Sequence, residues 1–172
     1  RTSALVQPQL RSYVAGSIDL RSDADRDTVQ AIAQHYHRMI DGYRRTLNIP
    51  PSNGKDRPLV YLLSTRDVYE AHLRSRGIDG GYSGGIHYWS REQDERAVAL
   101  PLDSDLRSRV LAVAQHEGFH QFAATRFEHP IPMWLNEGLA EYFEDGLVRR
   151  GSFKAGFVPA HRLDHLREAH RQ

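Results

Sequence analysis

The strongest constraint in this sequence is a pair of helix-forming segments joined by a short, proline-containing connection. The first segment follows the capping residues at 103–104 and must end before Pro130. The second has Pro132 in its first turn and extends to about Asp145, with Gly146 as its stop. Two helices joined this closely can pack antiparallel. We therefore expect side chains from the middle of one helix to face those from the middle of the other.

The rest of the chain alternates strand-like and helix-like patterns. In chain order, we expect one or two strands before residue 22, a long helix that is capped within 23–27 and continues to Tyr43, a strand over 59–63, a helix from 64–65 to 76, a hairpin of 86–89 and 97–100, the helix pair, a loop or strand over 151–158, and a short helix from 159 with Leu163 and Leu166 inward. This order indicates an α+β fold with a small mixed sheet.

Composition limits the class of protein. The 172 residues are 40% hydrophobic and 26% charged, which suits one globular domain over 1–172. A net charge of +1 provides no field that attracts nucleic acid, and the longest apolar run, 110–114, is far too short to span a membrane. The chain begins at Arg1 rather than Met, so we expect a piece of a longer chain or a cleaved leader, which slightly favours an extracytoplasmic location.

Cysteine is absent, which excludes disulfides, thiolate zinc sites and cysteine nucleophiles. Any bound metal must therefore be held by histidine and carboxylate side chains. The chain contains ten histidines, two of which are placed four residues apart in the first helix of the pair.

These two histidines belong to the sequence His116-Glu117-Gly118-Phe119-His120. Residues four apart on a helix lie on the same face, so both imidazoles can reach one metal ion. Glu117 follows the first histidine and is placed to act as a general base on a metal-bound water. The alternative is a surface pair of histidines on an amphipathic helix.

Glu137, in the second helix of the pair, favours the metal-site interpretation. Antiparallel packing brings Glu137 to the open side of His116 and His120, which completes a His₂Glu set and leaves a fourth position for water. A zinc ion with three protein ligands lowers the pKa of its water to about 7 and polarises a carbonyl. The predicted cofactor is therefore zinc, at a catalytic site.

The segments HEGFH, at 116–120, and WLNEGLAEYF, at 134–143, resemble the gluzincin zinc metallopeptidases, and more closely the peptidase MA-like proteins. The resemblance implies a zincin-like catalytic domain with an active-site helix pair. It also implies zinc binding by His116, His120 and Glu137, with Glu117 as general base in peptide-bond hydrolysis. The partner would be a peptide or protein substrate. Sixteen residues separate His120 from Glu137, slightly fewer than in familiar members, so a tighter inter-helix turn is expected.

Other site residues follow less directly. Glu141 lies one turn beyond Glu137 and is expected to accept the second N–H of His116, with a solvated surface glutamate as the alternative. Gly118 and Gly138 reduce helix propensity, which close packing of the two helices around the metal would explain. The strand at 97–100 resembles the edge strand that binds an extended peptide in gluzincins, although an ordinary sheet edge is equally compatible.

No motif identifies the donor that would stabilise a tetrahedral oxyanion, so the donor stays open. The candidates by residue type are Tyr82, His87, Tyr88, His129, Tyr142, His161 and His165. Two alternatives to a peptidase also stay open. One is a zinc-bound binding or regulatory module without turnover, and the other is a metal-free interaction domain with a fortuitous motif.

Overall fold

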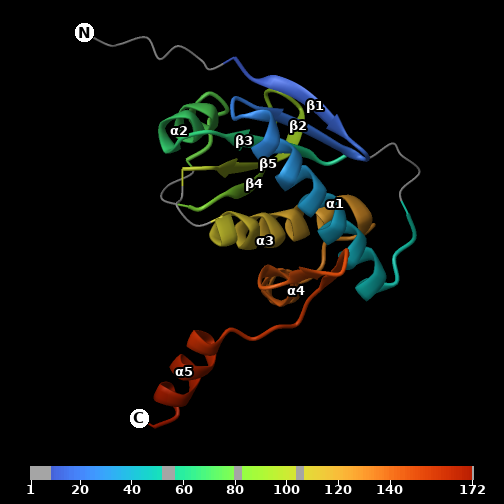
Figure 1. The fold of residues 1–172 in the computed structure, drawn as a ribbon, viewed down its shortest axis with the longest axis vertical. Helices are drawn as coiled ribbons and strands as arrows, with labels where there is room; N and C mark the ends of the chain where they lie inside the picture. The colour runs from blue at the N-terminus through green and yellow to red at the C-terminus, as the bar shows by residue number, and fades with distance from the viewer. Residues whose placement is uncertain (1–8, 52–56, 80–82, 104–106, 172) are drawn as a thin grey trace.

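The computed structural model describes residues 9–51, 57–79, 83–103 and 107–171, and it has the expected α+β architecture (Figure 1). Most of the predicted elements are confirmed within a few residues at each end. The helices and strands are β1 (Arg11–Ala15), β2 (Ile18–Ser22), α1 (Arg26–Leu47), β3 (Leu59–Leu63), α2 (Arg66–Arg74), β4 (Ile86–Ser90), β5 (Glu95–Pro101), α3 (Arg107–Arg126), α4 (Met133–Glu144), β6 (Leu147–Arg149), β7 (Ser152–Lys154) and α5 (Ala160–Ala169).

The main sheet is mixed, with the strand order β1-β2-β3-β5-β4. The β2-β3 and β3-β5 pairs are parallel, whereas β1-β2 and β4-β5 are antiparallel hairpins. The expectation that 97–100 forms an edge is therefore wrong, because β5 lies between β3 and β4. These residues are fully buried, as is typical of a strand covered on both faces. The edge strand next to them is β4.

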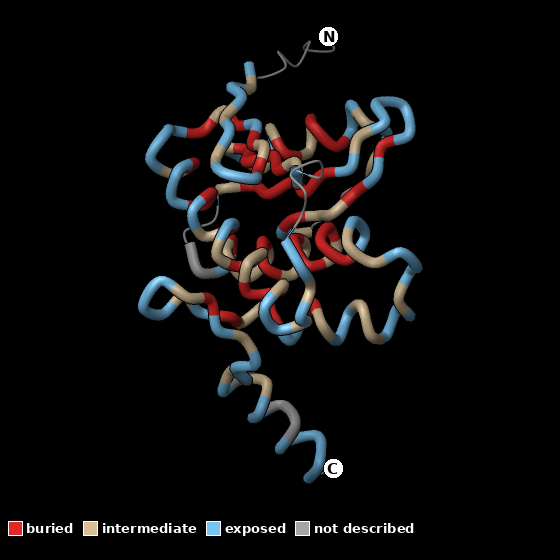
Figure 2. The backbone as a smooth tube through the Cα atoms, turned by 90° about the vertical axis from the view of Figure 1, so that its right-hand side faces the viewer, coloured by how far each residue is buried: buried red, intermediate tan, exposed pale blue. Residues whose placement is uncertain are grey.

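Alternate residues of the strands belong to two separate cores, one on each face of the sheet. Figure 2 shows that buried residues concentrate in the sheet and in the helices next to it, whereas the C-terminal helix is mostly exposed. Val60 and Leu62 of β3 face the larger core, which α1, α3 and α4 share. Tyr61 and Leu63 face the smaller core, which α2 covers. This alternation places α3 on one face of the sheet and confines α2 to the other.

Capping side chains begin two helices where the sequence predicts them. The Asp25 carboxylate accepts a hydrogen bond from the backbone N–H of Thr28 at 2.8 Å, and Thr65 caps α2 in the same way. Gly77 has a φ of +66°, a left-handed conformation that suits the end of a helical segment. The predicted cap of α3 at 103–104 falls partly outside the described residues.

Aromatic side chains join α3 to α1 and α4. The ring of Tyr43 in α1 lies 5.6 Å from the ring of Phe119 in α3 and 4.5 Å from that of Phe143 in α4, between centroids. The rings of Phe119 and Phe143 stack at 5.2 Å. All three side chains are fully buried, so they hold the three helices in one packed unit.

The two helical glycines have different environments, which corrects the common explanation expected for them. A Cβ atom at Gly118 would lie 2.9 Å from the hydroxyl of Tyr36 and would also overlap the methyl group of Met39, and both side chains belong to α1. A Cβ atom at Gly138 would meet nothing within 4 Å. Gly118 therefore allows α3 to approach α1 rather than α4, and Gly138 opens onto free space.

The C-terminal part also differs from expectation. The short hairpin of β6 and β7 precedes an extended segment, and α5 then extends away from the rest of the molecule, with Arg162 in its first turn paired to carboxylates at the end of α4 (Figure 1). Leu163 was expected to face inward but is 39% exposed, because α5 has no sheet or helix packed along its side. The side chain of Leu166 lies outside the described set.

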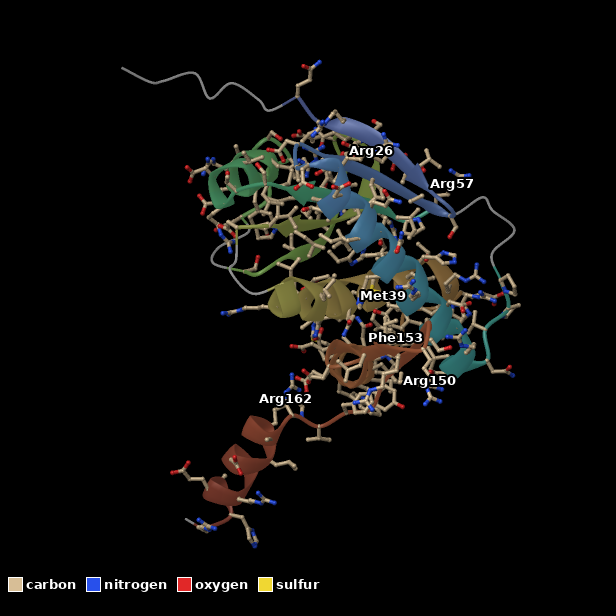
Figure 3. All side chains as sticks on the ribbon, in the orientation of Figure 1. Arg26, Met39, Arg57, Arg150, Phe153 and Arg162 are labelled. Atoms are coloured by element: carbon tan, nitrogen blue, oxygen red, sulfur yellow. The ribbon has the colours of Figure 1, made fainter. Side chains whose placement is uncertain are left out.

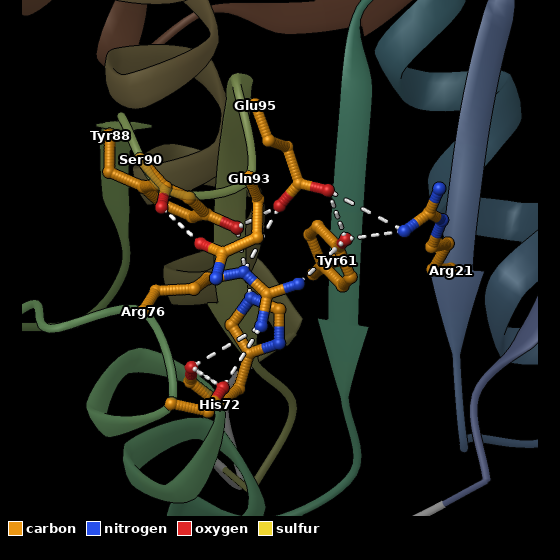
Figure 4. A network of polar contacts seen from close by, with 9 residues as sticks. Arg21, Tyr61, His72, Arg76, Tyr88, Ser90, Gln93 and Glu95 are labelled. Carbon is orange, nitrogen blue, oxygen red and sulfur yellow. Dashed lines mark hydrogen bonds and ion pairs between the residues drawn. The ribbon is translucent and has the colours of Figure 1, made fainter.

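A polar network holds the β4-β5 hairpin to β3 and α2 (Figure 4). The carboxylate of Glu95 accepts hydrogen bonds from the hydroxyls of Tyr61 at 2.6 Å and Tyr88 at 2.9 Å, and from Nε of Arg76 at 3.0 Å. The imidazole of His72 in α2 lies 3.0 Å from the Tyr88 hydroxyl. The network therefore orients β4, the strand that contributes a backbone group to the site described below.

Among the described residues, no helix combines the length and apolar character needed to cross a lipid bilayer. This agrees with the expectation from the short apolar runs of the sequence.

The glycine environments predict opposite effects of the same substitution. Gly118→Ala should lower the free energy of unfolding by about 1–3 kcal/mol, because the added methyl group overlaps buried side chains of α1. Gly138→Ala should raise it by up to about 1 kcal/mol through helix propensity alone. Urea denaturation of the metal-free proteins measures both. Equal effects would show that the α3-α1 contact is not as close as described.

His72 predicts loss of stability in acid. Burial lowers its pKa from 6.5 to about 3, so between these values the unfolded chain binds a proton that the folded chain excludes. The free energy of unfolding should therefore fall as pH decreases from about 6.5, by up to about 1.4 kcal/mol per pH unit from this group. His72→Gln should flatten this slope. An unchanged slope would mean that His72 does not control it.

Candidate metal centre

Three side chains from α3 and α4 converge at one point. The Nε2 atoms of His116 and His120 lie 3.5 and 3.6 Å from the same carboxylate oxygen of Glu137. One candidate ligand atom from each residue falls within 4.8 Å of the other two. Two imidazole nitrogens and one carboxylate oxygen form a donor set that fits zinc. The structure thus brings together the three residues that the sequence singles out as metal ligands.

The exposure of these side chains shows which side of the cluster is open. Those of His116 and His120 are only 22% and 13% exposed, whereas that of Glu137 is 52% exposed. The adjacent Gly138 has free space around it. The two histidines of α3 therefore form the buried side of the cluster, and the side next to Glu137 of α4 is open to solvent.

Glu117 lies beside the cluster and is held by the sheet. Its Oε2 atom accepts a hydrogen bond from the backbone N–H of His87 in β4 at 2.8 Å, which leaves Oε1 without this constraint. Burial raises the pKa of the Glu117 carboxyl, and the nearby imidazoles of His116 and His120 partly oppose this rise. A carboxylate with a raised pKa is better able to accept a proton than an ordinary surface glutamate.

The acceptor of the second nitrogen of His116 is Glu144, which corrects the contact expected from Glu141. Nδ1 of His116 lies 3.2 Å from Oε2 of Glu144. The Glu141 side chain is 59% exposed and pairs with Arg162 at 3.1 Å. At about 100° per residue, Glu141 is turned about 40° from Glu137 around the helix, whereas Glu144 is turned only about 20°. Glu144 also lies further along α4, beside the earlier turns of α3.

Gln115 connects the end of α4 to α3, and sequence reasoning missed it. Its side-chain NH₂ group donates to the carbonyl oxygens of Phe143 at 3.1 Å and Gly146 at 3.2 Å, and also to that of Glu144. Its carbonyl oxygen lies 2.7 Å from Nε2 of His35 in α1. The side chain satisfies carbonyl groups that end α4. The one sequence signal for Gln115 is its position directly before His116, in a segment predicted to be a helix with a buried face.

The candidate oxyanion donors are spread over the molecule. Tyr88 points into the polar network on the opposite face of the sheet, where it bonds Glu95. His129 is exposed in the connection between α3 and α4, and Tyr142 packs its ring against Phe143. Tyr82 and the side chains of His161 and His165 lie outside the described set.

His87 is the described candidate whose side chain is on the same face of the sheet as α3. Its Nε2 atom is buried without a hydrogen-bond partner. The pKa of this imidazole is lowered to about 4, first by burial and second by the positive charge that His120 can carry. His87 is therefore neutral at pH 7 and retains one N–H group that can be donated.

The outer side of β4 offers backbone groups to an extended chain. In an antiparallel pair, the N–H and C=O groups of alternate residues point away from the partner strand. The N–H of His87 does so, because it reaches Glu117. Trp89, two residues further, presents its backbone groups on the same free side, and its side chain is 50% exposed.

A family model described as "Protein of unknown function (DUF1570)" matches residues 110–172 of this chain. The matched segment includes the three candidate ligands, Glu117 and Glu144. No curated protein and no solved structure shows significant similarity to the chain.

The role of Gln115 predicts a stability effect. Gln115→Leu should lower the free energy of unfolding of the metal-free protein by about 1–3 kcal/mol, because buried carbonyl groups at the end of α4 lose their donor. Thermal unfolding measures the change. Gln34→Leu, on the exposed side of α1, is the control and should have a smaller effect. Equal losses of stability in the two variants would contradict the role of Gln115 as donor to the carbonyl groups at the end of α4.

Proposed function

We propose that this chain is a zinc-dependent metallopeptidase of the gluzincin type, with a zincin-like catalytic domain. The observation that carries the proposal is the convergence of His116, His120 and Glu137, whose ligand atoms lie within 4.8 Å of one another. Three protein ligands from two helices leave room for a water molecule, which distinguishes a catalytic zinc site from a closed structural one. The resemblance of both motifs to gluzincins supports the same interpretation.

Each residue of the site then has a role in hydrolysis. His116, His120 and Glu137 would hold the zinc ion, which supplies Lewis-acid activation of a water and of the scissile carbonyl. Glu117 accepts the proton of the attacking water on Oε1, because Oε2 is anchored to the backbone of β4. Glu117 then delivers that proton to the leaving amine.

The substrate would bind as an extended peptide along the free side of β4. Backbone groups of Trp89 are available to it, and the strand passes directly beside Glu117 through His87. The His87 imidazole is neutral and has a buried nitrogen without a partner, which makes it the described candidate for an oxyanion donor.

Zinc stoichiometry tests the metal part of this proposal. After dialysis against a trace of zinc, elemental analysis should give about one zinc per chain, because three ligand atoms already lie within 4.8 Å of one another and small side-chain rotations bring them to bonding distance of one ion. His120→Ala should lose the metal. His129→Ala, in the exposed α3-α4 connection, is the matched control and should retain it. Absence of zinc from the unsubstituted protein would refute the peptidase.

Substitution of the general base tests turnover. Glu117→Gln should keep its zinc but lower the rate of hydrolysis by at least about 10²-fold, measured by mass spectrometry on a mixture of unstructured peptides. Zinc binding without hydrolysis by the unsubstituted protein would instead favour a binding or regulatory module of the same fold.

A further inference from the structure

Arg162 connects the separate C-terminal helix to the candidate metal centre. Figure 3 places this residue at the end of α5 nearest to α4. Its guanidinium forms ion pairs with Glu141 at 3.1 Å, Glu144 at 3.2 Å and Asp145 at 3.8 Å. One cation therefore contacts three carboxylates at the C-terminal end of α4.

The contact with Glu144 is the important one for the site. The same atom, Oε2 of Glu144, lies 3.2 Å from Nη2 of Arg162 and 3.2 Å from Nδ1 of His116. A chain of two polar contacts thus runs from α5 to a candidate metal ligand. The planar guanidinium can bond several oxygens at fixed angles, so it restricts where the carboxylate lies.

Glu144 needs such a restraint because of its neighbours. Glu141 and Asp145 are also acidic and lie within one turn of the same helix end. The C-terminal end of a helix carries partial negative charge, which disfavours carboxylates there. Without a cation, Glu144 would be repelled from both neighbours and from the helix end, and its side chain is already 27% exposed.

We propose that Arg162 is a positioning residue for the metal centre, which holds the Glu144 carboxylate against Nδ1 of His116. This inference rests on the proposed zinc site. The Glu144 contact fixes the orientation of the imidazole so that Nε2 faces Glu137 and His120. Arg162 thereby makes the affinity for the metal depend on the docking of α5.

A purely structural role for Arg162 makes a different prediction. If the residue only attached α5 to α4, its loss would leave the affinity for zinc unchanged, because α5 contributes no described side chain to the ligand set. Zinc affinity is therefore the readout that separates the two roles, and it requires neither substrate nor turnover.

The experiment is a double-mutant cycle on zinc affinity, measured by competition with a chromophoric chelator. Arg162→Gln should weaken zinc binding about 3- to 10-fold, and Glu144→Gln about 10- to 100-fold, as is typical for groups that orient metal-bound histidines. The double variant should bind no more weakly than Glu144→Gln, because Arg162 acts through Glu144. Arg162→Lys should restore part of the affinity.

Arg167→Gln is the control, since Arg167 lies on the same helix, is 67% exposed and pairs with Asp164. Its zinc affinity should match that of the unsubstituted protein. Unchanged affinity in Arg162→Gln, or additive effects in the double variant, would overturn the inference and leave the zinc site intact. Failure of the unsubstituted protein to bind zinc would overturn both. Zinc binding without peptidase activity would leave the role of Arg162 standing.

Discussion

The packing of Phe119 against Tyr43 and Phe143 is the interaction on which the site depends. These three buried rings come from α3, α1 and α4, and their contacts determine how far α4 lies from α3. Phe119 is adjacent in sequence to His120, so the ring that anchors α3 in the core places the neighbouring imidazole about 100° away around the helix. The cluster of His116, His120 and Glu137 is consequently assembled by the hydrophobic core, without the help of an ion. A site prepared in this way loses little conformational entropy when a ligand binds.

Among the described residues, β4 is the strand through which the sheet contacts the site. β4 donates the His87 backbone N–H to Glu117, and the polar network around Glu95 holds β4 to β3 and α2 from the other face. Groups on opposite sides of the sheet therefore cooperate, because consecutive residues of β4 face opposite ways: Tyr88 enters the network and His87 faces α3. This arrangement restrains the candidate base from two directions, by α3 at its own backbone and by β4 at its carboxylate.

Much of the fold could be read from local patterns. Apolar periodicity and capping residues locate β3, α1 and α2 closely, because their signals come from neighbouring residues. The position of β5 inside the sheet could not be read in this way. The run 97–100 is equally apolar in an edge strand and in an interior strand, and only its pairing with β3 decides between them. Similarly, the reason for Gly118 is a contact with α1, some eighty residues earlier in the chain, which no local spacing reveals.

In the candidate site, too, some residues can be predicted from local sequence patterns and others depend on tertiary contacts. The candidate ligands His116, His120 and Glu137 can be recognised because metal coordination demands particular residue types at particular helical spacings. The residues that orient these side chains are less constrained in sequence position, because any carboxylate that reaches Nδ1 of His116 can accept its hydrogen bond. Sequence reasoning therefore chose Glu141, one turn from Glu137, whereas the helical rotation and the antiparallel course of α4 select Glu144. Arg162 was still less visible, because its position depends on an extended segment between β7 and α5 that has no periodic pattern. The candidate ligands can thus be recognised from residue type and helical spacing, whereas the groups that orient them depend on tertiary contacts.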